Sequence, residues 1–265
     1  MKWFIVVVSI VLLIGGCGNT PDKKVFKIGT NLWPGYEALH LAKTEKYFNE
    51  NIEVNTYESS TIVLNKFRKK EIDAAALTLD EVILLHDQGY TPIIVAVLDI
   101  SDGADVVIAQ NGIKSINELK DKSIGVENTA LGSYMLTRVL SKAKLTYKDI
   151  TLVPLSINRH EDAFKEKVVD SVITFEPVSS KLIKAGGVNI FSSKEIPGEI
   201  VDVLVINRDF VNTKFVNDIL QGWSKSVLKI NKRDKKAISL ISKRLNQSEE
   251  ELIASLETLK IPSLE

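Results

Sequence analysis

The sequence predicts an α/β fold made of two successive modules. Short runs rich in β-branched residues alternate with longer segments of helical periodicity over most of the chain. That alternation is typical of strand–helix–strand crossovers and of a parallel sheet. A length of 265 residues is also enough for two domains of about 100 residues each.

The chain begins with the features of a secretory signal. Lys2 supplies a positive charge, residues 4–14 are apolar, and Gly15 and Gly16 form a cleavage site of small residues. The apolar run is too short for a permanent membrane helix, which needs roughly 20 residues. We therefore expect residues 1–16 to be a signal peptide that is removed.

Cys17, the only cysteine, directly follows this cleavage site. The arrangement resembles a bacterial lipoprotein signal, in which the cysteine carries acyl chains such as palmitate, and more than one chain gives firm anchoring. We expect a lipid anchor at Cys17 and a polar tether over residues 17–24. The globular body would then sit at the cell membrane, facing the periplasm or the cell exterior. The alternative is a buried free cysteine behind a chance apolar start.

The first module follows the tether. Its β-branched runs predict strands at residues 26–28, 52–55, 74–77 and 93–98. The segments between them predict helices at residues 36–48, 62–69 and 80–88.

The second module repeats this pattern. We expect strands at residues 106–109, 123–126, 151–153, 171–174 and 189–191, with helices at residues 131–142, 159–165 and 178–184. One more strand is expected at residues 201–206. After it the sequence predicts only helices, at residues 213–230, 235–244 and 249–259.

Composition excludes several classes of function. The 34 basic residues balance the 34 acidic ones, so no long-range field favours nucleic acid. A single cysteine leaves no disulfide, no thiol nucleophile and no cysteine metal site. The three histidines stand alone, and no nucleotide-binding or serine-hydrolase motif occurs. We expect no metal, no cofactor and no nucleic-acid partner.

Polar and aromatic residues follow the strands of the first module, where ligands bind in open α/β sheets. Trp33 and Tyr36 come after the first strand, and Ser60 and Thr61 come after the second. Thr78 and Asp80 follow the third strand. A plainer interpretation is that the aromatic residues pack under a turn and that the others cap or complement helix N-termini.

The second module carries a matching set. Glu127, Thr129 and Ser133 follow the strand expected at residues 123–126, and Glu176 follows the strand expected at residues 171–174. Glu176 could also serve only to complement a helix dipole. Because all these positions fall on one predicted edge, we interpret them together as a ligand site.

Several stretches resemble a known protein family. They are Trp33-Pro34-Gly35-Tyr36 with Leu41-Ala42-Lys43 and Tyr47-Phe48, Ile72-Asp73-Ala74-Ala75, Gly125-Val126-Glu127 leading to Gly132-Ser133-Tyr134, and residues 170–177 ending in Phe175-Glu176-Pro177. Their order and spacing, from about residue 27 to residue 209, resemble the solute-binding proteins of ABC importers in the nitrate, sulfonate, taurine and thiamine-precursor group. The family often has tryptophan where this chain has Phe175.

The resemblance implies a two-lobed fold of the type II periplasmic-binding class, with the ligand held in a cleft between the lobes. Lobe 1 would comprise residues 25–100 and 201–265, and lobe 2 would comprise residues 101–200. The two crossing segments are then expected near residues 99–105 and 197–202.

The expected cleft is rich in carboxyl groups and poor in arginine. Asp102 and Asp202 fall at the crossings and join Asp80, Glu127 and Glu176. A simple oxyanion would meet several carboxylates here. An amine-bearing or heterocyclic ligand pairs more naturally with this set.

We therefore expect a monomeric solute-binding lipoprotein that is not an enzyme. It would capture a small polar molecule, nitrogen-containing or a sulfonate, by lobe closure and present it to an ABC permease. The alternatives are an enzyme on the same scaffold, as in thiamine or menaquinone biosynthesis, and a ligand-sensing subunit of a membrane receptor. The expected ligand-binding residues are Trp33, Tyr36, Ser60, Thr61, Thr78, Asp80, Asp102, Glu127, Thr129, Ser133 and Glu176.

Overall fold

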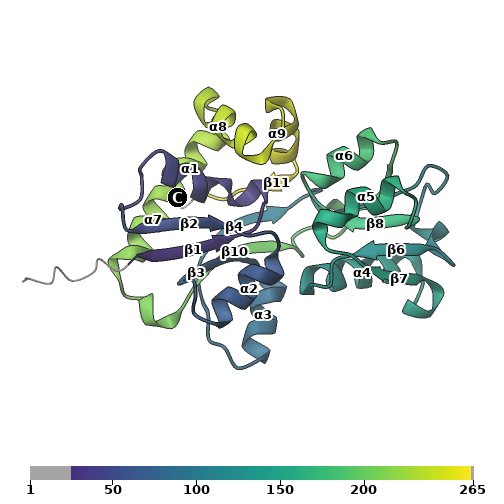
Figure 1. Ribbon diagram of the computed structural model, residues 1–265, viewed down its shortest axis with the longest axis horizontal. Helices are drawn as coiled ribbons and strands as arrows, with labels where there is room; N and C mark the ends of the chain where they lie inside the picture. Colours follow the sequence, from purple (N-terminus) through teal and green to yellow (C-terminus); the bar gives the residue numbers. More distant parts are fainter. Residues whose placement is uncertain (1–24, 264–265) are drawn as a thin grey trace, which may run out of the picture.

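Two β-sheets, each covered by helices on both faces, lie along the long axis of the molecule (Figure 1). The computed structural model describes residues 25–263. We call the first sheet with its helices lobe 1 and the second sheet with its helices lobe 2. The mixed α/β fold expected from the sequence is confirmed.

Lobe 1 contains a six-stranded sheet in the order β11-β4-β10-β3-β1-β2. Its strands are β1 (Phe26–Thr30), β2 (Ile52–Thr56), β3 (Ala74–Thr78), β4 (Ile93–Ser101), β10 (Val201–Ile206) and β11 (Leu259–Lys260). Its helices are α1 (Glu37–Thr44), α2 (Ser60–Arg68), α3 (Leu79–Asp87), α7 (Lys214–Asn231), α8 (Lys235–Leu245) and α9 (Glu249–Leu256).

Lobe 2 contains a five-stranded sheet in the order β7-β6-β8-β5-β9. Its strands are β5 (Val106–Ala109), β6 (Ser123–Val126), β7 (Thr151–Pro154), β8 (Ser171–Thr174) and β9 (Val188–Ser192). Its helices are α4 (Ala130–Ala143), α5 (His160–Lys165) and α6 (Val178–Lys184).

Each sheet has apolar cores on both of its faces. In lobe 1, α1, α7, α8 and α9 cover one face and α2 and α3 cover the other (Figure 1). In lobe 2, α4 covers one face and α5 and α6 cover the other. These layers fix the strand ends, so that the loops beyond them are held in place. Within residues 25–263 we find no helix that combines the length and apolarity needed to cross a membrane.

The parallel sheet expected from the alternation of strands and helices is found only in part, because both sheets are mixed. β1 pairs in parallel with β2 and β3, but β10 is antiparallel to its neighbours β3 and β4. In lobe 2, β5 is antiparallel to β8 and β9. The reason is that β4 leads the chain out of lobe 1 and β10 brings it back, so the returning strand must run in the opposite direction.

The expected last helix is also shorter than the sequence pattern indicates. Residues 249–259 were expected to be helical, but α9 ends at Leu256 and Leu259 begins β11, which pairs with the end of β4. The open edge of the lobe 1 sheet outweighs the helical periodicity of these residues.

The chain passes between the lobes twice, through residues 102–105 and 193–200. The two passages are hydrogen-bonded to each other. The hydroxyls of Ser101 and Ser193 lie 2.8 Å apart, and the backbone N–H of Gly103 donates to Ser193 Oγ at 2.6 Å. Gly103 has a φ of 119°, which favours glycine, and a side chain there would meet Lys194.

Candidate functional site

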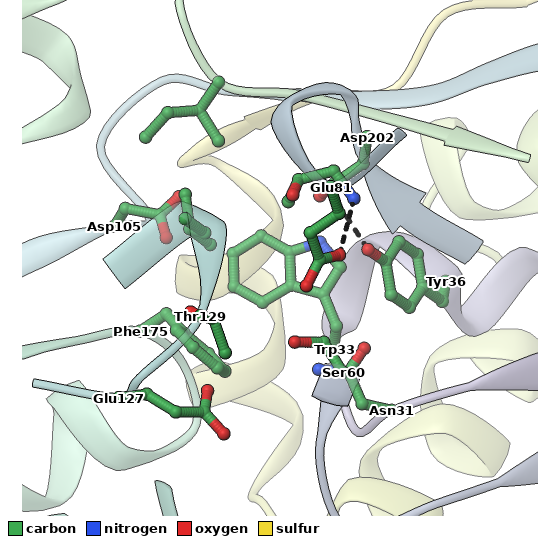
Figure 2. A pocket seen from close by; sticks show the side chains of 13 residues that line it. Asn31, Trp33, Tyr36, Ser60, Glu81, Asp105, Glu127, Thr129, Phe175 and Asp202 are labelled. Atoms are coloured by element: carbon green, nitrogen blue, oxygen red, sulfur yellow. Dashed lines mark hydrogen bonds between the residues drawn. The ribbon is translucent and has the colours of Figure 1, made fainter. Parts of the chain in front are cut away.

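A pocket lies where the two lobes meet, and residues of both lobes line it. Figure 2 shows its labelled side chains gathered around the indole of Trp33. Lobe 1 contributes Asn31, Trp33, Tyr36, Ser60, Thr78, Glu81 and Asp202. Lobe 2 and the passage leading into it contribute Asp105, Glu127, Thr129, Leu131 and Phe175. The second passage contributes Ile200.

The lobes are in contact on either side of this pocket. Helix α3 packs against α4, and Lys184 of α6 forms an ion pair with Glu251 of α9. Inside the pocket, the ring of Phe175 meets the ring of Trp33 edge to face, with centroids 5.5 Å apart. The structure therefore holds the lobes in a closed arrangement.

Trp33 is positioned by the turn that follows β1. Its backbone is extended, and Pro34 begins a short 3-10 turn that leads to α1. The indole Nε1 donates a hydrogen bond to Asp99 Oδ2 at 3.1 Å. A side chain on Gly35 would lie 1.8 Å from the same oxygen, so only glycine lets the turn approach Asp99 this closely.

Asp99 and Asp202 form a buried carboxyl pair behind the aromatic residues. They are register partners on the antiparallel strands β4 and β10. The hydroxyl of Tyr36 donates to Asp202 Oδ1 at 3.1 Å. Burial raises the pKa of Asp99 to about 7 and raises the pKa of Asp202 well above its ordinary value. Burial therefore disfavours the state in which both carboxyls of this pair are ionised.

Glu81 enters the pocket from the N-terminus of α3. Its Oε2 accepts a hydrogen bond from the backbone N–H of Thr78 at 3.1 Å, as in a capping box. Burial raises the pKa of Glu81 to about 7, and the neighbouring charge of Asp80 adds to this.

The wall from lobe 2 is less enclosed. Glu127 is half-buried after β6, and burial raises its pKa to about 7. Thr129 is the N-cap of α4, where its Oγ1 accepts from Gly132 N at 3.0 Å. Phe175, after β8, is also half-buried.

Asp105 lies at the end of the first passage, directly before β5. The residue is 3% exposed, and its Oδ2 has no hydrogen-bond partner among the described residues. Burial raises the pKa of Asp105 to about 6, and the charge of Asp80 contributes. The pocket thus contains a buried acceptor with spare hydrogen-bonding capacity.

Six of the residues expected from the sequence line the pocket together. They come from both lobes: Trp33, Tyr36, Ser60, Thr78, Glu127 and Thr129.

The other five expected residues lie outside this lining. Thr61 is exposed and lines a neighbouring hollow, because it faces outward on the first turn of α2. Ser133 is exposed on α4. Asp102 pairs with Lys260 at 2.9 Å, which holds it on the surface. Glu176 accepts from Ser180 Oγ at 2.9 Å. Asp80 is half-buried, and burial raises its pKa.

Some pocket residues were missed in the sequence. Glu81 and Asp105 carried no signal of a ligand site by themselves, whereas Asn31 directly follows the first strand and opens the loop of Trp33 and Tyr36, without being among the expected ligand-binding residues. The stretch Thr78-Leu79-Asp80-Glu81 does match a capping box, which would have placed Glu81 at the start of the helix. No comparable pattern marks Asp105, since only the passage between the lobes brings it to the pocket.

Comparison with known proteins places the chain in a family. The model of the NMT1-like family matches residues 19–243, so the chain belongs to that family. A curated Brucella abortus protein named as a binding protein is 29% identical over 111 residues. That match covers 42% of this chain and 31% of the relative, so the aligned part spans about a third of its length.

Solved structures share the fold. The periplasmic aliphatic sulphonate binding protein of Escherichia coli matches with a TM-score of 0.77 and 18% identity, covering 91% of this chain and 87% of that one. A ligand-binding component of an ABC-type import system from Staphylococcus aureus matches with a TM-score of 0.78 and 19% identity, covering 91% of this chain and 86% of that one. The periplasmic nitrate-binding protein of Synechocystis matches with a TM-score of 0.71 and 15% identity, covering 88% of this chain and 70% of that one.

These findings confirm the periplasmic-binding fold and the family resemblance seen in the sequence. Two of these neighbours are periplasmic binding proteins, and the third is the ligand-binding component of an import system. At identities below 20%, the likeness shows the fold of this chain and leaves its ligand to be argued from the pocket.

Proposed function

We propose that this member of the NMT1-like family is an extracytoplasmic solute-binding lipoprotein of an ABC importer. It captures a small polar molecule between its lobes and presents it to a membrane permease. The observation that carries the proposal is the pocket itself, because its lining comes from both lobes and from the passages that join them. It works as a monomer and without enzymatic activity.

The mechanism is lobe closure. A solute in this pocket touches Trp33 and Tyr36 on one side and Glu127 and Phe175 on the other. It makes both sets of contacts only when the lobes are together, so binding shifts the population towards the closed form. The hydrogen-bonded passages at residues 102–105 and 193–200 are the points about which the lobes move, with lobe 1 spanning residues 25–100 and 201–265.

Lobe closure is tested with the solute that copurifies with the protein. The solute is released by denaturation, identified, and added back to solute-free protein during small-angle X-ray scattering. We expect the radius of gyration to fall on addition. A bound solute that leaves the radius unchanged would contradict closure.

The lipid anchor rests on Cys17, which lies outside the described residues. Acylation there would tether the body to the membrane next to its permease. Cys17→Ser should leave the fold unchanged and release the protein from the membrane fraction. A serine variant that stays in that fraction with its signal uncleaved would contradict the anchor while leaving the solute-binding function in place.

A further inference from the structure

Carboxyl groups dominate the charge of the pocket. Glu81, Asp105, Glu127 and Asp202 all line it, and Asp99 lies directly behind Trp33. Among residues 25–263, no lysine or arginine lines this pocket. An anionic solute would therefore either face like charges, which costs several kcal/mol, or require these carboxyls to take up protons.

Two buried oxygen acceptors of the pocket have hydrogen-bonding capacity to spare, beside the hydroxyl of Thr78, which also has no partner among the described residues. The donors on Trp33 and Tyr36 are already engaged by Asp99 and Asp202. In contrast, Asp105 Oδ2 and Asn31 Oδ1 are buried and have no partner within the described part of the chain. Buried polar atoms are normally hydrogen-bonded, so a solute that fits must bring donors.

The arrangement of the carboxyls favours an organic cation over a metal ion. No three His, Cys, Asp or Glu side chains among residues 25–263 are grouped closely enough to hold a metal. The acceptors are instead spread around the rings of Trp33, Tyr36 and Phe175. Aromatic surface with dispersed carboxylates suits a cation that has an apolar or heterocyclic body.

We propose that the solute is a small organic cation, a protonated amine or a protonated nitrogen heterocycle, whose charge lies between Asp105, Glu81 and Glu127. This proposal rests on the proposed function and names the class of solute. It differs from the sulphonate and nitrate that appear in the names of two structural neighbours.

The charge distribution also links this solute to closure. Glu81 belongs to α3 of lobe 1 and Glu127 to lobe 2, so closing the lobes brings two carboxyls into one pocket. Without a cation they repel each other or take up protons. A bound cation turns this repulsion into attraction from both sides and so selects the closed form.

Proton release follows from the same geometry. Burial raises the pKa of Glu81 and of Glu127 to about 7 and that of Asp105 to about 6. The titratable groups around them are Asp80, Asp99, Asp202, the hydroxyl of Tyr36, and His160 of α5, which lines an adjoining hollow together with Asp105 and Glu127. Burial lowers the pKa of His160 to about 4, so its imidazole brings no positive charge near neutral pH. A cation favours the ionised carboxyls, so its binding should release protons near neutral pH. An anion should cause proton uptake.

The test uses the purified full chain and probes of similar shape but different charge. Benzylammonium, benzyl alcohol and benzenesulfonate form one set, and propylammonium, propanol and propanesulfonate form another. Bound ligand raises the melting temperature. We expect the two ammonium probes to raise it more than their neutral and sulfonate counterparts, and calorimetry in buffers of different ionisation enthalpy to detect proton release.

Glu127→Gln and Glu53→Gln are the matched variants. Glu53 is exposed on β2, away from the pocket, so its change should leave the preference for cations intact. Glu127→Gln should weaken binding of the ammonium probes on the order of 30-fold, as expected for loss of one partner of a buried charge pair.

Three results would overturn the cation proposal. The first is a larger rise in melting temperature with the sulfonates than with the ammonium probes. The second is an equal rise with cationic, neutral and anionic probes, or no rise with any of them. The third is an unchanged preference for the ammonium probes in Glu127→Gln. A preference for sulfonates would leave the proposed function standing, because a solute would still bind. The proposed function is tested separately, by the scattering experiment with the copurified solute.

Discussion

The two walls of the pocket are built differently. On lobe 1, Trp33 and Tyr36 are nearly enclosed, at 5% and 3% exposure, and each donates a hydrogen bond to a buried carboxyl. On lobe 2, Glu127 and Phe175 are half-buried. The first wall belongs to the core of its lobe, whereas the second is enclosed mainly by the approach of the other lobe.

This difference indicates how the work of binding is divided. A wall held by its own lobe is preorganised and keeps its shape when the lobes separate. A wall whose side chains gain their partners on closure contributes to affinity with little effect on the stability of the solute-free protein. Substitutions on the two sides should therefore separate stability from binding.

The largest effect is expected for Trp33→Ala. This residue packs in the core of lobe 1, and its loss also leaves the Asp99 carboxyl without its indole donor. We predict that the free energy of unfolding falls by about 3–5 kcal/mol, measured by urea denaturation without solute. Trp33→Phe keeps most of the packing and should cost less. An unfolding free energy within error of wild type for Trp33→Ala would show that the lobe 1 wall is not preorganised.

The next effect concerns the pH dependence of stability. Burial raises the folded pKa of Glu81 from its ordinary value of 4.5 to about 7. Because the folded pKa is the higher one, the contribution of Glu81 to the free energy of unfolding is complete below about pH 4.5 and is lost as the pH rises through about 7. The loss is on the order of 3 kcal/mol. Glu81→Gln keeps the capping geometry and removes this loss.

Melting at pH 4 and pH 8 checks this prediction. Wild type and Glu81→Gln should melt alike at pH 4, and the variant should be the more stable at pH 8. Glu127→Gln should show a smaller gain, because separation of the lobes exposes Glu127 to water when no solute is bound. Equal gains for the two variants would mean that the walls do not differ in this respect.

Phe175→Ala should change binding more than stability. The ring is half-buried and meets Trp33 across the pocket. We predict a loss of roughly 1–3 kcal/mol in affinity for the copurified solute by calorimetric titration, with a smaller change in solute-free unfolding. The opposite ranking of the two quantities would assign Phe175 to the core of lobe 2.

The smallest effect is expected for Thr129→Ala. Thr129 caps α4 through the N–H of Gly132, so its loss should destabilise the protein by about 1 kcal/mol. Thr129→Ser keeps the cap and serves as the control. A drop in affinity with unchanged stability would instead make the Thr129 hydroxyl a contact to solute.

Much of the fold could be predicted from the sequence because local patterns carry it. The runs that predict strands at residues 106–109, 123–126, 171–174 and 201–206 match the observed strands at both ends. The direction of β10 could not be predicted, since it depends on how the chain returns from lobe 2. The short strand β11 depends on the free edge of β4, which no local pattern encodes.

The site was predictable where loops follow strands directly. Trp33, Tyr36, Ser60 and Glu127 follow strands and do line the pocket. Ser133 follows a strand as well, but its position on α4 turns it outward. Asp105 and the buried partner Asp99 depend on the passage between lobes and on strand register, which are properties of the folded chain.

The most direct measurement is native mass spectrometry of the protein purified without denaturation. If the pocket between the lobes is the solute site, wild type and Glu53→Gln will carry one small organic molecule per chain, and the double variant Glu127→Gln with Phe175→Ala will lack it. The same bound mass on all three proteins would contradict this assignment.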